Sequence, residues 1–209
     1  LELPKQFVRI GPQGETILET TVKIFDDCPA VDEILITANR DFIVQCRALC
    51  ERFTKVWGVV PGGKERQDSV SNGAALCGDA EYIAVHDAAR PFITPEEIET
   101  VCADAEKYGA ATLAVPVKDT IKVAAADGTV CATPERSTLR AIQTPQVFRL
   151  SLYKEALCLA KNAGKQYTDD CQLIEAAGGK VYLTPGDYKN IKITTPEDLL
   201  VAEAFAAEK

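Results

Sequence analysis

The chain of 209 residues is long enough to form one domain around a single apolar core, and its 46% hydrophobic and 26% charged residues are typical of a globular protein and not of a disordered one. Its 31 acidic and 23 basic residues give a net charge of −8, which disfavours binding to a nucleic-acid polymer or an anionic membrane surface. Because the chain has neither a run of 18 apolar residues nor a basic-then-apolar leader, we expect a cytoplasmic protein.

The first part of the chain alternates between helical and strand patterns. Residues 15–25 place apolar side chains on one helical face, and residues 33–38 form a short apolar run typical of a buried strand. Helices and strands are predicted next at 41–53, 55–60, 68–77 and 82–86. This order predicts parallel βαβ units, whose ligands bind beyond the carboxyl ends of the strands.

The second part begins with a well-marked helix. Thr94-Pro95-Glu96-Glu97 supplies an N-cap, a proline at the first position and a capping-box glutamate, so we expect a helix to Tyr108 and then a strand at 111–117. Residues 118–140 interrupt the alternation, because two short apolar segments flank the turn sequence Ala126-Asp127-Gly128. They predict a projecting β-arm. Further helices and strands are expected at 151–162, from 167–170 onward, at 180–184 and after 195–198.

The eight cysteines include no C-x-x-C pair, and one histidine leaves few partners for zinc. We therefore interpret them as thiols of the core. Cys46 and Cys50 are one helical turn apart, and we expect both to be reduced.

Polar residues that follow the predicted strands are the first candidates for a site. Gly62 and Gly63, followed by Lys64 and Arg66, precede a predicted helix, so bare backbone and basic side chains suit a phosphate or a nucleobase. The alternative is a plain glycine turn with solvated charges. Asp87 follows the strand at 82–86, where a lone carboxylate can hold Mg²⁺ together with substrate phosphates; the alternative is a loop-capping aspartate.

His86 is the only histidine of the chain, and we expect it to have a structural, hydrogen-bonded role. A Ser-His-Asp set would have to use this residue, and its direct linkage to Asp87 disfavours that arrangement. Hydrolase chemistry is therefore not expected. Arg90 either anchors the following loop or reaches a phosphate.

Seven motifs occur in a specific order: PKQF, GG-x-x-R-x-x-S-V, HDAARPF, PVKDT, QTPQVF, TDD and NIKIT-TPEDL. The ordered set resembles the 2-C-methyl-D-erythritol 4-phosphate cytidylyltransferase family of the non-mevalonate isoprenoid pathway, over the whole chain. The resemblance implies an α/β, Rossmann-like nucleotidyltransferase fold with a mostly parallel twisted sheet, as one domain over residues 1–209. It implies CTP as co-substrate, Mg²⁺ as cofactor, and a homodimer in which the β-arm of about 118–140 clasps a second copy.

The resemblance also implies roles for individual residues. Lys5 and Lys192 match lysines near the substrate phosphates, and Asp87 matches the residue between metal, nucleotide and sugar. The nucleotide-binding positions are Gly63, Lys64, Arg66, Ser69 and Ala88, although some relatives carry another residue at the position of Lys64. The sugar-phosphate positions are Thr120, Arg136, Thr144 and Thr168. Of these, Thr120 and Arg136 belong to the arm and are expected to reach the second subunit, and Thr168 equally fits a helix N-cap.

One departure from the family lies ahead of PKQF, where its members have a strand and a Gly-rich loop with a basic residue. Both are missing here, and the chain contains no methionine, so we expect the natural protein to extend upstream. Loss of a central strand leaves unpaired hydrogen-bonding edges on both neighbouring strands.

The expected chemistry is attack by the phosphate of methylerythritol phosphate on the α-phosphorus of CTP, with release of pyrophosphate. A phosphate monoester with a second pKa of about 6 is ionised at pH 7 and needs no general base. Two alternatives remain at this point. One is a ribitol 5-phosphate cytidylyltransferase with the same chemistry, and the other is a catalytically silent CTP-binding protein, suggested only by the missing loop.

Overall fold

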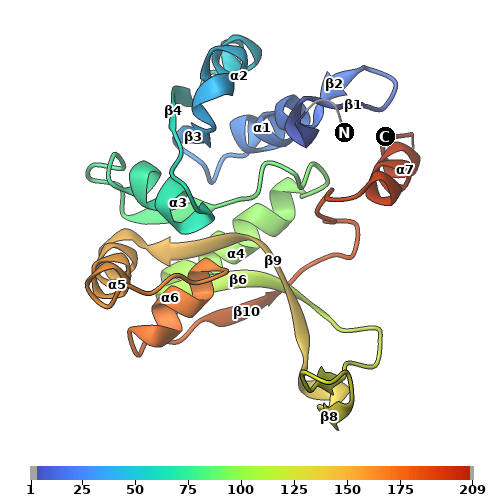
Figure 1. The fold of residues 1–209 in the computed structure, drawn as a ribbon. Helices are drawn as coiled ribbons and strands as arrows, with labels where there is room; N and C mark the ends of the chain where they lie inside the picture. The colour runs from blue at the N-terminus through green and yellow to red at the C-terminus, as the bar shows by residue number, and fades with distance from the viewer. Residues whose placement is uncertain (1–3, 208–209) are drawn as a thin grey trace.

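The computed structural model describes residues 4–207, in which helices and strands alternate as predicted (Figure 1). The α/β class is therefore confirmed. Before the capped helix at Thr94 the elements are the 3₁₀ turn η1 (Lys5–Phe7), β1 (Arg9–Ile10), β2 (Glu15–Thr16), α1 (Ile17–Asp27), β3 (Ile34–Ala38), η2 (Arg40–Phe42), α2 (Ile43–Cys50), β4 (Val56–Pro61), α3 (Arg66–Ala74) and β5 (Tyr82–Val85).

The second part contains the longer elements. They are α4 (Pro95–Tyr108), β6 (Ala110–Pro116), β7 (Val123–Ala124), β8 (Val130–Ala132), the 3₁₀ turn η3 (Arg136–Thr138), β9 (Arg140–Arg149), α5 (Leu150–Asn162), α6 (Asp170–Ala176), β10 (Tyr182–Pro185) and α7 (Pro196–Ala206). The capping boxes at Thr94 and Thr195 are both formed, as predicted. Local capping chemistry therefore determines where α4 and α7 begin.

The main sheet has the strand order β10-β6-β9-β5. β10 pairs with β6 in parallel, whereas β9 is antiparallel to both β6 and β5. Three of the four strands therefore run in one direction, and β9 opposes them from a central position. The QTPQVF motif lies within β9, for which the periodicity gave no assignment.

Helices cover both faces of this sheet (Figure 1). On one face, Ile98 and Val101 of α4 pack against Leu113 of β6, and all three are fully buried. On the other face, Tyr153 of α5 and Ile174 of α6 complete a second cluster. Because both faces are covered, β6 is an almost continuous apolar run, as strands buried on two sides require.

A second, two-stranded sheet consists of β3 and β4 in parallel. A cavity of about 1330 Å³ lies between β3 and β5 and is lined by both strands and by residues of α1 and α3. Within residues 4–207, β3 pairs only with β4 and β5 only with β9, so each of the two strands has one edge without a strand partner. The predicted strand at 33–38 forms as β3, but it is only half-buried because it borders this cavity.

The β-arm predicted at 118–140 is a hairpin of β7 and β8 that projects from the main sheet (Figure 1). Gly128, in the left-handed region with φ of 86°, donates its N–H to Ala125 at 3.0 Å and closes the turn. Val123 and Val130 are about half exposed on the arm, at 47% and 60%. The arm thus presents apolar side chains to its surroundings.

The cysteines divide between core and surface. Cys28, Cys46, Cys50 and Cys171 are buried, and all eight thiols are free. The interpretation as core thiols is wrong for Cys131 and Cys158, which are exposed on β8 and α5. Among the described residues, no helix is both long enough and apolar enough to cross a membrane.

Candidate active site

Asp87 lies in the loop that follows β5, and the neighbouring hydrogen bonds fix its backbone. The Asp87 N–H donates to Thr144 Oγ1 at 3.1 Å, and the Thr144 hydroxyl donates to Nδ1 of His86 at 3.0 Å. His86 Nε2 donates to the carbonyl of Arg90 at 3.3 Å, because that oxygen only accepts. Burial lowers the pKa of His86 to about 4. The imidazole is therefore neutral at pH 7 with both nitrogens bonded, which confirms its predicted structural role.

Three cations surround the Asp87 carboxylate. Lys192 Nζ lies 2.8 Å from Oδ2, Arg66 Nε lies 3.5 Å from Oδ1, and Arg90 Nε lies 3.9 Å from Oδ2. Burial raises the pKa of Asp87. The hydrogen bond and charge of Lys192, together with the charges of Arg66 and Arg90, lower it by more than burial raises it. Since the pKa lies below its ordinary value, Asp87 is ionised at neutral pH.

Lys5 joins this cluster from the other end of the chain. Burial lowers its pKa, the charge of Lys192 lowers it further, and the charge of Asp87 acts in the opposite direction. The N- and C-terminal segments lie close together (Figure 1), and Gly11 N–H donates to Glu203 Oε2 at 3.1 Å. The fold thus brings together the three residues predicted as catalytic: Lys5, Asp87 and Lys192.

The segment that carries Lys192 is attached to the Asp87 loop through the backbone. Ile193 N–H donates to the carbonyl of Ala89 at 2.9 Å, and Arg90 Nη1 donates to the carbonyl of Asn190 at 2.7 Å. Of the two roles considered for Arg90, loop anchoring is therefore the one that its contacts support. These bonds hold Lys192 over Asp87 without help from a ligand.

The glycine loop between β4 and α3 folds back on its own helix. Gly63 N–H donates to Ser69 Oγ at 2.9 Å, and Ser69 Oγ donates to the carbonyl of Glu65 at 3.1 Å. A Cβ atom on Gly63 would lie 2.2 Å from the Cβ of Asp68, so only glycine fits at this position. The plain glycine turn remains compatible with these contacts.

The other predicted nucleotide residues lie around this loop. Arg66 is the first residue of α3 and so lies inside the helix, not ahead of it as its sequence position suggested. Lys64 is exposed, and no contact in the described part of the chain joins it to Asp87. Ala88 is half-buried, and its carbonyl accepts a hydrogen bond from Thr21 Oγ1 at 3.0 Å.

The four predicted sugar-phosphate residues are not gathered at one point. Thr144 is 4% exposed, and its hydroxyl is engaged by His86 and Asp87. Thr120 and Arg136 are exposed on the arm, where Arg136 Nη1 donates to the carbonyl of Lys118 at 3.0 Å. Among residues 4–207, no contact joins either arm residue to Asp87.

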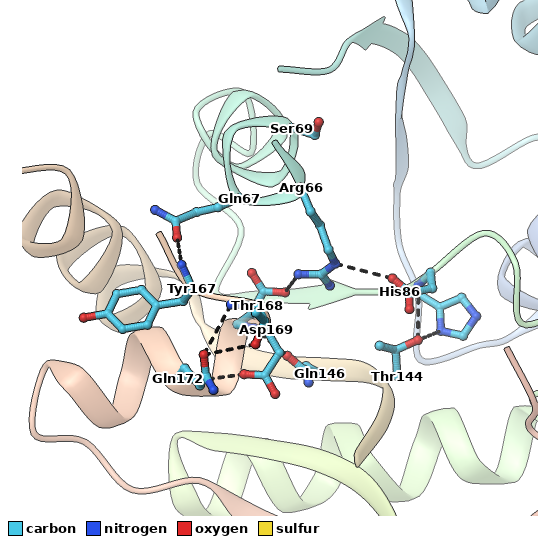
Figure 2. Close-up of polar contacts among 12 residues, drawn as sticks. Arg66, Gln67, Ser69, His86, Thr144, Gln146, Tyr167, Thr168, Asp169 and Gln172 are labelled. Atoms are coloured by element: carbon cyan, nitrogen blue, oxygen red, sulfur yellow. Dashed lines mark hydrogen bonds and ion pairs between the residues drawn. The ribbon is translucent and has the colours of Figure 1, made fainter. Parts of the chain in front are cut away.

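Thr168 lies just ahead of α6 and is exposed. Its N–H and hydroxyl both donate to Gln172 Oε1 at 3.2 Å, whereas the N-cap of α6 is Asp169, whose Oδ1 accepts from Gln172 N at 2.8 Å (Figure 2). The alternative role of Thr168 as an N-cap is therefore wrong.

The sequence interpretation missed a buried polar group next to this site. Asp170, which is 1% exposed, accepts from Arg66 Nη1 at 2.6 Å and from the Tyr153 hydroxyl. Its own N–H donates to Gln146 Oε1 at 3.0 Å. The available signal was that Gln146 and Asp170 belong to the QTPQVF and TDD motifs, each followed by apolar residues; a buried polar side chain requires a partner.

Asp87 is also the only metal ligand that the sequence predicted. No group of three or more histidine, cysteine or acidic side chains among the described residues is arranged to hold an ion, which excludes a cage made by protein ligands alone within them. The arrangement fits the other common Mg²⁺ site, in which one carboxylate and substrate phosphates share the ion. Asp87 Oδ1, whose cationic contact is the 3.5 Å one to Arg66, is the more open oxygen for that purpose.

The fold and this site define a nucleotidyltransferase. Its cations collect around one carboxylate at the carboxyl end of β5, where an open α/β sheet binds ligands and where a polyanionic nucleoside triphosphate is stabilised.

The comparisons with known proteins then identify the family. The profile of the 2-C-methyl-D-erythritol 4-phosphate cytidylyltransferase family matches residues 1–208, and the chain belongs to this family. It is 44% identical over 206 residues to the enzyme of that name from Clostridium perfringens, covering 98% of this chain and 91% of the relative. It is 46% identical over 203 residues to the one from Bacillus licheniformis, covering 96% and 87%.

Solved structures agree with this result. 4-Diphosphocytidyl-2C-methyl-D-erythritol synthase from Anaerococcus prevotii superimposes with a TM-score of 0.89 at 31% identity, covering 97% of this chain and 90% of that one. 2-C-methyl-D-erythritol 4-phosphate cytidylyltransferase from Thermus thermophilus gives a TM-score of 0.81 at 33% identity, covering 97% and 93%. These matches favour the methylerythritol family over the ribitol 5-phosphate alternative and confirm the Rossmann-like nucleotidyltransferase fold.

The half-buried histidine gives a pH prediction. The pKa of His86 is 6.5 without structure and about 4 in the folded chain, so the unfolded state binds a proton that the folded state excludes. This contribution to stability is complete above pH 6.5 and is lost as the pH falls toward 4. We expect the free energy of unfolding to decrease more steeply between pH 6.5 and pH 4 in the wild type than in His86→Gln, as measured by urea denaturation.

A second measurement gives the pKa directly, because one histidine produces one set of imidazole signals in NMR. A signal that titrates near pH 6.5, or equal pH slopes in the two variants, would contradict the neutral state of His86.

Proposed function

We propose that the cluster of Asp87, Lys192, Lys5 and Arg66 is the place where this cytidylyltransferase joins CTP to 2-C-methyl-D-erythritol 4-phosphate. The observation that carries the proposal is the Lys192 contact of 2.8 Å to an ionised Asp87, with further cations on either side. The products are the CDP-linked methylerythritol and pyrophosphate.

In the proposed reaction, an oxygen of the methylerythritol phosphate forms a bond to the α-phosphorus of CTP. The bond from that phosphorus to the bridging oxygen of the β-phosphate breaks, and pyrophosphate leaves with the electron pair. The attacking phosphate, with a second pKa of about 6, is mostly ionised at pH 7, so it needs no general base. The absence of a general base agrees with the contacts of His86, because both of its ring nitrogens already take part in hydrogen bonds.

The difficulty of this reaction is electrostatic, because an anion attacks a polyanion and charge builds on the leaving oxygen. Lys192 contacts Asp87 directly, and Lys5 lies near enough for the charges of both residues to act on it, so both lysines require little rearrangement to stabilise that charge. Burial and the charge of Lys192 lower the pKa of Lys5. Phosphates that bind beside Lys5 raise its pKa again, because negative charge favours the protonated amine.

We assign the nucleotide to the glycine loop and its surroundings. Gly63 has no side chain, and so the backbone can approach a base closely, while Ser69 holds the loop in shape. Lys64, Arg66 and Ala88 border the same region. Mg²⁺ bound between Asp87 and the phosphates would neutralise charge on the triphosphate and orient it.

We assign the compartment to the cytoplasm. Eight free thiols suit a reducing compartment, where disulfides do not persist.

Removing one charged group tests the site. We expect Lys5→Ala or Asp87→Ala to lower kcat by about 100-fold or more, the size found when one preorganised charge stabiliser is lost. Pyrophosphate release from CTP and methylerythritol phosphate measures the effect. Lys161→Ala, which removes an exposed lysine of α5, is the matched control and should keep normal turnover. Near-normal turnover of both site variants would contradict the assignment.

We further propose a homodimer in which the arm of each copy supplies Thr120 and Arg136 to the sugar-phosphate site of the other, where Thr144 and Thr168 contribute from the sheet side. Two features support this arrangement: the arm projects away from its own sheet, and its valines Val123 and Val130 are exposed. Exposed apolar side chains on a projecting hairpin favour contact with another chain.

Complementation distinguishes an arm that acts in its own chain from one that acts in the partner. We expect Arg136→Ala and Lys5→Ala to be nearly inactive separately, but mixed and re-annealed copies should regain about a quarter of wild-type activity, because half of the dimers then hold one intact site of two. A mixture no more active than its components, or a monomer in light scattering, would exclude this arrangement.

We also propose that residues 1–209 form one nucleotidyltransferase domain whose sheet is completed by a further strand between β3 and β5, followed by the Gly-rich loop of the family. The two facing edges and the cavity of about 1330 Å³ between them support this proposal. Since α1 and α3 line the cavity on either side, the strand should be apolar on both faces.

A chimera tests the missing strand. The residues of the Clostridium perfringens relative that precede its match to this chain are fused ahead of it. We expect the chimera to unfold at a higher temperature and to bind CTP more tightly than the 209-residue chain. A chimera with proline at the centre of the added strand is the control, since proline cannot donate to the sheet. Equal Tm values for all three proteins would contradict the proposal.

A further inference from the structure

Asp170 places a carboxylate in the interior, beside the proposed nucleotide site. Its side chain is 1% exposed, and a buried charge is unfavourable unless every polar atom has a partner. Arg66 Nη1 lies 2.6 Å from Oδ2, the Tyr153 hydroxyl donates to Oδ1, and the backbone N–H is taken by Gln146. Asp170 is also the first residue of α6, where the helix dipole favours a negative charge.

Arg66 connects this buried carboxylate to Asp87. Its Nη1 contacts Asp170 and its Nε contacts Asp87, so the planar guanidinium bridges the interior and the site. Burial lowers the pKa of Arg66, but the charge and hydrogen bond of Asp170 more than compensate, and the pKa lies above its ordinary value. Contacts at two nitrogens of a planar guanidinium fix the direction of the third.

The position of Arg66 makes this support necessary. It is the first residue of α3, and a cation at a helix N-terminus is disfavoured by the helix dipole. An apolar core would stabilise this region at least as well as a buried ion pair, so stability alone does not require one here. Among the described residues, Nη2 of Arg66 has no hydrogen-bond partner, which leaves its two N–H donors for phosphate oxygens.

We propose that Asp170, held by Tyr153, is a positioning residue that orients Arg66 beside Asp87 for binding of the nucleotide phosphates. The inference rests on the proposed nucleotide site at Arg66. Asp170 itself touches no reacting atom, because it is enclosed between α5, α6 and Arg66.

A double-mutant cycle tests this role. We expect Asp170→Asn to raise the KM for CTP by about 10-fold with a smaller change in kcat, a coupling typical of contacting charged groups. In the Arg66→Ala background the same substitution should change neither constant, because its effect passes through Arg66. Multiplicative effects of the two substitutions would overturn the proposal.

Asp169→Asn is the matched control. It removes the same charge one residue earlier and keeps an N-cap side chain on α6, so the KM for CTP should stay normal. If Asp170→Asn does not fold, Tyr153→Phe carries the test, since it removes the hydroxyl and keeps the ring stacked on Phe148 at 5.1 Å. Its effect on the KM for CTP should likewise disappear in Arg66→Ala.

The cycle separates two kinds of failure. Normal constants in Arg66→Ala would overturn the nucleotide site itself, whatever Asp170 does. An impaired Arg66→Ala together with normal Asp170→Asn and Tyr153→Phe would overturn only the positioning role.

Discussion

The ion pair between Asp87 and Lys192 is the contact on which the arrangement of the site depends. It joins a residue from the middle of the chain, at the end of a sheet strand, to a lysine from the C-terminal segment, at 2.8 Å. The overall charge of −8 repels anionic substrates, so the site needs a local excess of cations. A carboxylate placed among those cations keeps them close together when no phosphate is present. When the substrates bind, their phosphates become new negative partners for these cations.

The surroundings keep that carboxylate in place. Thr144 links the Asp87 N–H to the neutral ring of His86, whose other nitrogen bonds to the carbonyl of Arg90. None of these bonds involves a group that changes its charge near pH 7, since the pKa of His86 is about 4. The only histidine of the chain is thereby part of the scaffold. The site therefore acts through fixed charges and not through proton transfer. This agrees with a phosphate nucleophile that is already ionised at pH 7.

Local signals in the sequence predicted local structure well. The capping box at Thr94 and the turn at Gly128 are each set by a few neighbouring residues, and both formed as expected. The order of motifs predicted Lys5, Asp87 and Lys192 as one site. The central antiparallel β9 and the contact of Asp170 with Arg66, 104 residues away, were missed, because pairing between distant segments leaves no periodic pattern. Burial of Cys131 was mispredicted because its apolar neighbours belong to an exposed hairpin.

β9 makes the integrity of the site dependent on sheet register. Thr144 and Gln146 are two residues apart on this strand, and one binds the backbone of Asp87 while the other binds the backbone of Asp170. A slip of one residue in the pairing of β9 would turn both side chains to the opposite face of the sheet. A misaligned chain would therefore lose its support for Asp87 and for Asp170 in a single error. Correct alignment of β9 is therefore a condition for a competent site, because both supports come from the same face of one strand.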